Sequence, residues 1–420
     1  MPAPSFAYLC ERFPSFVQTF VYREVEEMAR QGMEPLVFSI RRPENPTELT
    51  EPLTVAVQYF PDSEALRAEI DKLNDAGKLP ANVHRAIGKA RKEKDSNRVF
   101  EAAWLGPQLR REGIKHVHAH FAGIAARTAW WLRELYGISY SFTGHANDIF
   151  CENQFSVSNG DLVRDASFIV AVTDFARQWL EKKYPRAQGR IFRVYNGVDR
   201  NFPPWQPAGD PPLILSVGRY VEKKGFDDLI EACVALRERG RAFRCEIVGE
   251  GPIEAALKAQ ISRAGLERDV ILTGPLPQSE VRRRLASAQA FVLACVPENS
   301  GGSDNLPTVV MEAMMCGVPV VSTRVAGLPE MIQHGENGLL VAPRTASALA
   351  LALEQLLRDN VLATKFGSRG HGTAVAKFSS ENTTRALKHL LVRHAGVKPP
   401  PRAADLDPTL PRGLMSRWFG

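Results

Sequence analysis

The sequence lacks any apolar run of the roughly 18 residues that a membrane-spanning helix needs. Its longest apolar runs, such as residues 290–296, have the length of buried strands instead. The first residues also lack a basic segment followed by an apolar stretch, which argues against a secretory signal. We therefore expect a cytoplasmic protein.

Cysteine is scarce, with six residues in 420, and neither a C-x-x-C pair nor zinc-like spacing occurs. These absences argue against a disulfide framework and against a structural zinc site. Most of the cysteines stand in apolar segments, as small core residues do. The spacing alone leaves a catalytic cysteine–histidine pair open.

A strong charge imbalance is lacking as well, because the net charge is only +6. This charge suits a protein that binds phosphates or an anionic membrane surface, and equally one that binds neither. Basic residues are not interleaved with aromatic ones, so we expect no nucleic-acid partner. The hydrophobic share of 44% and the charged share of 24% are typical of a soluble globular protein, and the length suffices for two domains.

Short β-rich apolar runs alternate with amphipathic helical stretches through most of the chain. The alternation stops at residues 201–212, where five prolines in twelve residues exclude a helix or an interior strand. Strand–helix alternation predicts parallel sheets covered on both faces. The predicted strands are residues 5–9, 36–40, 116–119, 138–142, 168–172 and 191–194 before the break, and 213–217, 243–248, 270–273, 290–294 and 318–321 after it.

The predicted fold class is therefore α/β, with two Rossmann-like doubly wound domains that face each other across a cleft. The N-terminal domain is predicted to span residues 1–203 with a helical insertion at 63–98, and the C-terminal domain residues 204–375. Residues 376–395 are predicted to form a helix that crosses back to the N-terminal domain, and the proline-rich residues 396–420 a disordered tail. In such sheets, ligands bind beyond the carboxyl ends of the strands, at helix N-termini.

A cluster of glycine and basic residues follows the first strand of the C-terminal half. The strand ends at Gly218, where the missing side chain allows a ligand to approach the backbone. Arg219 can fork onto phosphate oxygens, and Lys224 can add a point charge. Both cations could stabilise the charge on a departing diphosphate. A solvated charge run at a turn is the alternative.

Two carboxylates, Asp304 and Glu312, stand eight positions apart around a predicted helix start. Pro307 suits the first turn of that helix, and the backbone N–H groups of residues 306–309 could bind a phosphate. Glu312 lies between apolar positions and therefore needs a partner. A ribose diol is one suitable partner, and a buried structural ion pair is the alternative.

Several segments, together with a glycine turn at residues 325–330, resemble glycosyltransferase family 4. These are retaining enzymes of the GT-B fold that use nucleotide-sugar donors. The C-terminal match runs from about residue 192 to 342 in the family's order and spacing, and the N-terminal half is similar to members from bacterial exopolysaccharide and lipopolysaccharide biosynthesis of the colanic-acid type. The matching segments are ILSVGRYVEKKGFDDLIEA, IVGEGP, ILTGPLP, DNLPTVVMEAMMCGVPVVST and AGLPEMI, and in the N-terminal half FPSFVQTFVYREVEEM, HVHAHFA and SYSFTGHANDIF.

The resemblance implies roles for the residues of the C-terminal half. Arg219 and Lys224 are assigned to the donor diphosphate, and Glu312, the second carboxylate of the family's E-x7-E motif, to the ribose. Asp304 stands at the first carboxylate, near the transferred sugar, where the family usually has glutamate, so this side chain is shorter by one methylene. Glu298 is a rival acid, six residues out of register. The predicted donor-binding residues are Gly218, Arg219, Lys224, Asn305, Leu306, Pro307, Thr308, Val309 and Glu312.

The resemblance also implies contacts from the N-terminal half. His145, in FTGHAND, matches a histidine that approaches the donor sugar, and a structural histidine is the alternative. Residues 14–18 correspond to the loop by which this domain meets donor and acceptor. The predicted acceptor-side residues are Ser15, Phe16, His120 and Asp148. The predicted catalytic residues are His145, Asp304, Arg219 and Lys224.

The activity that the resemblance implies is transfer of a hexose, with retention, from a UDP- or GDP-sugar to a saccharide or lipid-linked saccharide. Contact with an anionic inner membrane would accompany a lipid-linked acceptor. No second carboxylate can be placed for a double displacement, so front-face attack is favoured. No Asp-x-Asp pair follows a predicted strand, so we expect neither a metal nor another cofactor. The alternatives are a nucleotide-sugar epimerase of the same fold and a non-catalytic nucleotide-sugar-binding subunit of a polysaccharide assembly complex.

Overall fold

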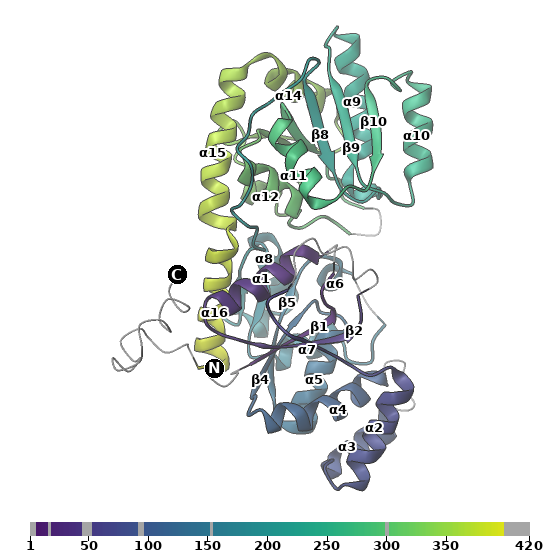
Figure 1. Ribbon diagram of the computed structural model, residues 1–420, viewed down its shortest axis with the longest axis vertical. Coiled ribbons are helices and arrows are strands. Elements are labelled where there is room, and N and C mark those ends of the chain that lie inside the picture. The colour runs from purple at the N-terminus through teal and green to yellow at the C-terminus, as the bar shows by residue number, and fades with distance from the viewer. Residues whose placement is uncertain are drawn as a thin grey trace, which may run out of the picture.

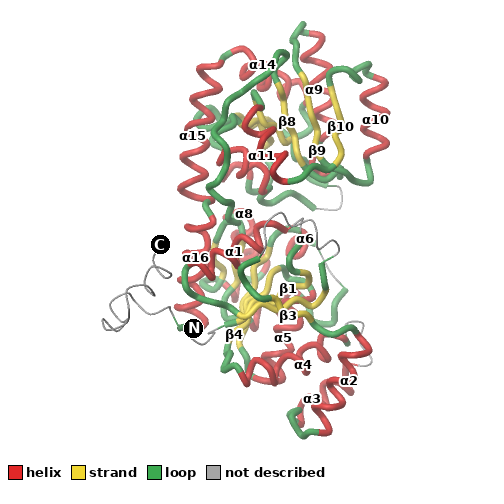
Figure 2. Tube along the Cα trace, in the orientation of Figure 1, coloured by secondary structure: helices red, strands yellow, loops and turns green. Residues whose placement is uncertain are grey.

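The computed structural model describes residues 6–15, 18–43, 53–90, 96–151, 154–298 and 302–398. Within them the strands form two separate parallel sheets, each covered by helices (Figures 1 and 2). This arrangement confirms the α/β class with two doubly wound domains that the strand–helix alternation predicts. No helix in the described ranges is long and apolar enough to cross a membrane.

The N-terminal sheet has seven strands in the order β3-β2-β1-β4-β5-β6-β7, and all neighbours are parallel. Its strands are β1 (Ala7–Arg12), β2 (Leu36–Arg41), β3 (Val57–Tyr59), β4 (His116–His120), β5 (Ser139–Gly144), β6 (Ile169–Ala171) and β7 (Ile191–Arg193). The helices of this half are α1 (Thr19–Arg30), α2 (Ser63–Asp75), α3 (Ala81–Ala90), α4 (Asn97–Arg111), α5 (Ile124–Tyr136), α6 (Asn147–Phe150), α7 (Asn159–Asp165) and α8 (Asp174–Lys183).

The C-terminal sheet has six parallel strands in the order β10-β9-β8-β11-β12-β13. Its strands are β8 (Leu213–Val217), β9 (Arg244–Val248), β10 (Val270–Gly274), β11 (Ala290–Leu293), β12 (Val320–Thr323) and β13 (Leu339–Val341). The helices are α9 (Phe226–Glu238), α10 (Glu254–Arg263), α11 (Gln278–Ser287), α12 (Thr308–Cys316), α13 (Leu328–Met331) and α14 (Ala346–Arg358).

The last two helices connect the domains. α15 (Asn360–Phe378) packs on α12 of the C-terminal half, and α16 (Ser380–Ala395) packs on α1 of the N-terminal half (Figure 1). Leu387 and Leu391 of α16 are buried in the same cluster as Phe6 and Tyr8. The end of the chain therefore completes the core on one face of the N-terminal sheet.

One helical segment lies apart from the sheets. Residues 63–98, which we expect to be helical, hold α2 and α3, and both pack against α4 at the outer end of the N-terminal domain (Figure 1). Of the predicted tail, residues 399–420 lie outside the described residues.

Two strand boundaries differ clearly from their predictions. The strand predicted at residues 5–9 runs on to Arg12. The strand predicted at residues 318–321 begins only at Val320 and runs to Thr323. Pro319 has no N–H to donate to a neighbouring strand, so the ladder begins after it.

Candidate active site

A cavity of about 940 Å³ lies between the two domains. Its wall includes residues that directly follow strands of both sheets, namely His145 after β5, Gly218 after β8 and Gly249 after β9. The carboxyl ends of both parallel sheets therefore face one space, as is usual for ligand sites in doubly wound folds.

Most of the predicted site residues line this cavity. They are Ser15, His145, Gly218, Arg219, Lys224, Asp304, Asn305, Leu306, Pro307, Thr308, Val309 and Glu312. Phe16 lies outside the described residues. His120 and Asp148, predicted on the acceptor side, are not among the residues that line the cavity. Each contacts His145 instead, His120 at its ring and Asp148 at its backbone N–H.

A glycine turn brings Lys224 to the cavity. Gly225 adopts φ 63°, and a Cβ at this position would stand 1.9 Å from the carbonyl oxygen of Ala294. A side chain is therefore excluded both by the left-handed backbone and by the close packing on β11. The side chain of Lys224 passes beside Gly218, whose hypothetical Cβ would lie 3.1 Å from Cε of Lys224.

Lys224 forms an ion pair with Asp304 at the cavity wall. Nζ of Lys224 lies 2.5 Å from Oδ2 of Asp304, and Nζ of Lys223 lies 3.7 Å from Oδ1. Burial by itself raises the pKa of Asp304, but the two ammonium groups outweigh burial, and the pKa is lowered. The carboxylate is therefore ionised, and it occupies the lysine that we assign to the donor diphosphate.

Glu312 has a partner from the other domain. Nη2 of Arg23, on α1, lies 2.9 Å from Oε1 of Glu312, and Nε of Arg23 lies 3.2 Å from Oδ2 of Asp199. The Arg23 side chain is only 1% exposed. The structural ion pair considered as the alternative for Glu312 is thus present, and it joins the two domains at the edge of the cavity.

Asn305 and Glu330 also join the domains. The amide of Asn305 donates to the carbonyl oxygen of His145 at 2.7 Å and accepts from the hydroxyl of Thr173 at 2.6 Å. The carboxylate of Glu330 accepts the backbone N–H groups of Asp174 and of the next residue at the start of α8, each at 2.8 Å. The segment at residues 325–330 therefore contacts the N-terminal domain as well as following β12.

His145 packs against two aromatic rings and one carboxylate at the cavity wall. The carboxylate of Asp148 accepts its backbone N–H, and the rings of Phe20 and Phe121 lie 4.7 and 4.3 Å from its ring, centroid to centroid. Burial, and then the neighbouring His120, lower the pKa of His145 well below its usual value. The imidazole is therefore neutral near pH 7, and it can act as an acceptor or donor of a hydrogen bond.

Three histidines of β4, at alternate positions, point to the same face of the sheet. His116 lies within 2.9 Å of the hydroxyls of Ser139 and Ser141, and His118 within 3.0 Å of those of Ser141 and Thr143. Nitrogen and oxygen atoms of His118, His120 and Glu24 come within 4.8 Å of one another, which is close enough for a metal ion. Both nitrogens of His118, however, are already occupied by hydroxyls, so a metal would displace one of them.

Replacing His116 by asparagine should flatten the pH dependence of stability. Burial lowers the pKa of His116 to about 3, whereas the unfolded value is about 6.5. A depressed folded pKa gives stability that is complete above about pH 6.5 and is lost as the pH falls below it. Between about pH 6 and 4, the wild type should therefore lose roughly 1.4 kcal/mol per pH unit more than the variant. Urea unfolding over this range measures the difference, and parallel profiles would contradict the assignment.

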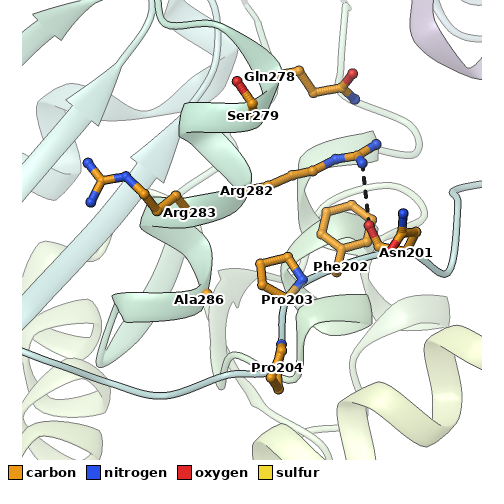
Figure 3. A pocket seen from close by; sticks show the side chains of 9 residues that line it. All are labelled: Asn201, Phe202, Pro203, Pro204, Gln278, Ser279, Arg282, Arg283 and Ala286. Atoms are coloured by element: carbon orange, nitrogen blue, oxygen red, sulfur yellow. Dashed lines mark hydrogen bonds between the residues drawn. The ribbon is translucent and has the colours of Figure 1, made fainter. Parts of the chain in front are cut away.

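A second cavity, of about 700 Å³, lies where α11 meets the proline-rich connection (Figure 3). Nη1 of Arg282 donates to the carbonyl oxygen of Asn201 at 3.3 Å, and its guanidinium lies 4.9 Å from the ring of Phe202. Nη2 of Arg282 is 3.5 Å from Asp199, which also contacts Arg23. Arg282 therefore connects the proline-rich residues 201–212 to the ion pairs that Arg23 forms with Asp199 and Glu312.

Sequence reasoning missed the residues that act across the interface. Arg23 stands in a helix beside Glu24, Glu26 and Glu27, which suggest only local ion pairs, whereas its partners Asp199 and Glu312 lie far along the chain. The alternation of histidines in β4 was a readable signal for a shared face, but it did not identify Glu24 as their neighbour. Further cavity residues with polar side chains that the sequence did not single out are Tyr22, Asn196, Glu250 and Gln278.

Comparison of the whole chain with known protein structures identifies its fold. A glycosyltransferase from Rickettsia africae superposes with a TM-score of 0.71 at 17% identity, covering 94% of this chain and 100% of that one. HepE from Anabaena, in complex with UDP, gives a TM-score of 0.67 at 18% identity, with coverages of 92% and 99%. At such identities the likeness establishes the fold alone, which is the GT-B arrangement of two facing domains.

Sequence comparisons establish the family. Residues 17–202 match the family described as Glycosyltransferase Family 4, and residues 198–372 match Glycosyl transferases group 1. WcaL of Escherichia coli, named as a colanic acid biosynthesis glycosyltransferase, is 30% identical over 81% of this chain and 88% of its own length. AmsK of Erwinia amylovora, named for amylovoran biosynthesis, is 37% identical over 44% of this chain and 46% of its own length. The chain belongs to glycosyltransferase family 4.

Proposed function

We propose that this glycosyltransferase moves a hexose, with retention of configuration, from a UDP- or GDP-sugar to a saccharide or lipid-linked saccharide in cell-surface polysaccharide biosynthesis. One observation carries the proposal: Arg219, Lys224, Asp304 and Glu312 line the interdomain cavity from one side and His145 from the other. The names of WcaL and AmsK support the polysaccharide assignment, and the UDP bound by HepE supports the donor class.

The reaction that suits these residues is a front-face displacement. The bond between the anomeric carbon and the diphosphate oxygen breaks while the acceptor oxygen bonds to the same carbon on the same face. The acceptor's proton passes to the departing diphosphate. Arg219, Lys224 and the N-terminus of α12 would hold the charge that develops on that group. Asp304 would stabilise the positive charge on the sugar ring.

The proposed reaction needs no metal ion, since two cations already stand where the diphosphate charge would develop. A lipid-linked acceptor would bring the protein to the anionic inner membrane. Movement of the domains about residues 201–212 would close the cavity and exclude water from the donor.

The donor site predicts a thermal shift with one nucleotide. UDP or GDP at about a hundred times its dissociation constant should stabilise the protein by roughly 2.7 kcal/mol and raise the unfolding midpoint by several degrees, in EDTA as in magnesium. Arg219→Ala should remove the shift, because this exposed side chain lines the cavity and contributes charge there. The exposed Arg263, at the end of α10, provides the control variant.

Other outcomes would contradict the proposal. No shift with UDP, GDP, ADP or CMP would argue against the donor site. A shift that EDTA abolishes would contradict metal independence. Conversion of the donor sugar without any acceptor would indicate an epimerase.

A further inference from the structure

A line of four polar side chains runs from β1 to the cavity wall. The hydroxyl of Tyr8 donates to Oε1 of Glu24 at 2.8 Å, and Nε2 of His120 lies 3.2 Å from the same oxygen, a charge contact whose alignment is not that of a hydrogen bond. Nδ1 of His120 then lies 3.4 Å from Nε2 of His145. His145, the last member, lines the cavity, and its Nδ1 is buried without a hydrogen-bond partner among the described residues.

Glu24 sets the direction of this line. Its carboxylate can only accept, as the contact from Tyr8 shows. A carboxylate oxygen next to a ring nitrogen favours a proton on that nitrogen, so of the two neutral tautomers of His120 the one with its proton on Nε2 and a bare Nδ1 is favoured. A bare Nδ1 can meet Nε2 of His145 only if that atom carries the proton. His145 then has its lone pair on Nδ1.

We propose that Glu24 and His120 are positioning residues that hold His145 as the Nε2–H tautomer, so that Nδ1 accepts a hydrogen bond from a hydroxyl of the bound sugar. The inference rests on the proposed nucleotide-sugar donor. Its consequence is specificity: a hydroxyl at this point of the sugar is bound, whereas a group that can only accept leaves Nδ1 buried and unpaired. The neighbouring rings of Phe20 and Phe121 pack against the imidazole and restrict its rotation.

The tautomer can be measured without any donor. The full chain labelled with ¹⁵N in its nine histidines gives two-bond ¹H–¹⁵N correlations, and His145→Gln assigns the His145 signals. Near neutral pH, we expect a protonated Nε2 and a bare Nδ1 for His145. A proton on Nδ1, or a charged ring, would overturn the inference. Because no ligand is added, this result stands whether or not the donor assignment is correct.

Glu24→Gln tests the origin of the tautomer. The glutamine can accept from Tyr8 with its oxygen and donate to Nε2 of His120 with its amide, which reverses the proton positions on both histidines. We expect the His145 proton to move to Nδ1 and kcat for transfer to fall roughly ten- to a hundredfold, as when an orienting carboxylate behind a histidine is lost. The dissociation constants of UDP and GDP should stay within about twofold, because the diphosphate and ribose contacts lie in the other domain.

His116→Asn is the matched control, since His116 is buried on the same strand and its ring nitrogens lie near Ser139 and Ser141 instead. Its tautomer pattern at His145 and its kcat should match those of the wild type. Unchanged His145 signals and unchanged kcat in Glu24→Gln would overturn the inference. If the wild type showed the expected tautomer but bound no nucleotide, only the proposed donor would be refuted.

Discussion

Replacement of Asp304 by asparagine is expected to slow sugar transfer strongly while strengthening the binding of the nucleoside diphosphate. In the free protein, Oδ2 of Asp304 lies 2.5 Å from Nζ of Lys224, so a diphosphate must share or take over that ammonium. Two like charges about 4 Å apart repel by roughly 4 kcal/mol at an effective dielectric constant of 20. Asparagine keeps the shape and removes the repulsion, so the dissociation constant for UDP or GDP should fall at least about tenfold.

The same substitution removes a negative charge that the transition state requires. The sugar ring becomes positive as the diphosphate leaves, and Asp304 is the carboxylate that we place beside it. We expect kcat to fall by about 10²–10³, the size that loss of one preorganised electrostatic contact has in other enzymes. Calorimetric titration with the nucleotide and initial transfer rates, both at low and at moderate salt, measure the two effects in one preparation.

Two variants sharpen this test. Asp304→Glu restores the charge with the reach that the family usually has, and it should keep transfer. Glu298→Gln changes the rival acid, which is not among the residues lining the cavity, and it should leave both quantities unchanged. Weaker nucleotide binding in Asp304→Asn would contradict the competition for Lys224. An active Asp304→Asn with an inactive Glu298→Gln would transfer the role to Glu298.

The fold could be predicted because its main signals are local. Apolar runs bounded by helices mark each central strand, and five prolines mark the connection at residues 201–212. The strands β3 and β13 were missed; each is a short strand at the edge of its sheet and pairs with one neighbour only. β3 pairs with β2 through Val57 and Val37, a contact over 20 positions that no local pattern contains (57 − 37 = 20).

In the candidate site, too, the residues could be predicted, whereas their contacts could not. Lys224 and Asp304 could be found because each stands in a segment with recognisable chemistry at a strand end or helix start. Their pairing could not, since it depends on how two loops approach each other. Likewise, Asp148 follows His145 closely in the sequence. Its carboxylate accepts several backbone N–H groups only because of the turn after β5, which the sequence does not reveal. Sequence therefore predicted which residues gather at the cavity better than which residues hold one another there.

Replacement of Arg23 by alanine is expected to lower the free energy of unfolding strongly. Its buried guanidinium carries the charge that neutralises Glu312 and Asp199, whose side chains are 13% and 27% exposed. Removing one partner of a buried ion pair costs about 3–5 kcal/mol, because the remaining charges lose their compensation. Arg23→Ala should therefore lower the calorimetric unfolding midpoint by about 3–6 °C, because a chain of 420 residues has a large entropy of unfolding. The exposed Arg30, on the same helix, is the matched control, and Arg30→Ala should change the stability by no more than about 0.5 kcal/mol.

A double-mutant cycle with Glu312→Gln separates the ion pair from simple loss of packing. If Arg23 and Glu312 act on each other, the two single losses should exceed the loss in the double variant by about 1–3 kcal/mol. Additive losses would show that Arg23 stabilises the protein through its other contacts, and an Arg23→Ala variant as stable as Arg30→Ala would remove the ion pair from the account. Since Arg23 comes from α1 and Glu312 from α12, a measured coupling would also be a direct measure of how strongly the two domains are held together at the edge of the donor cavity.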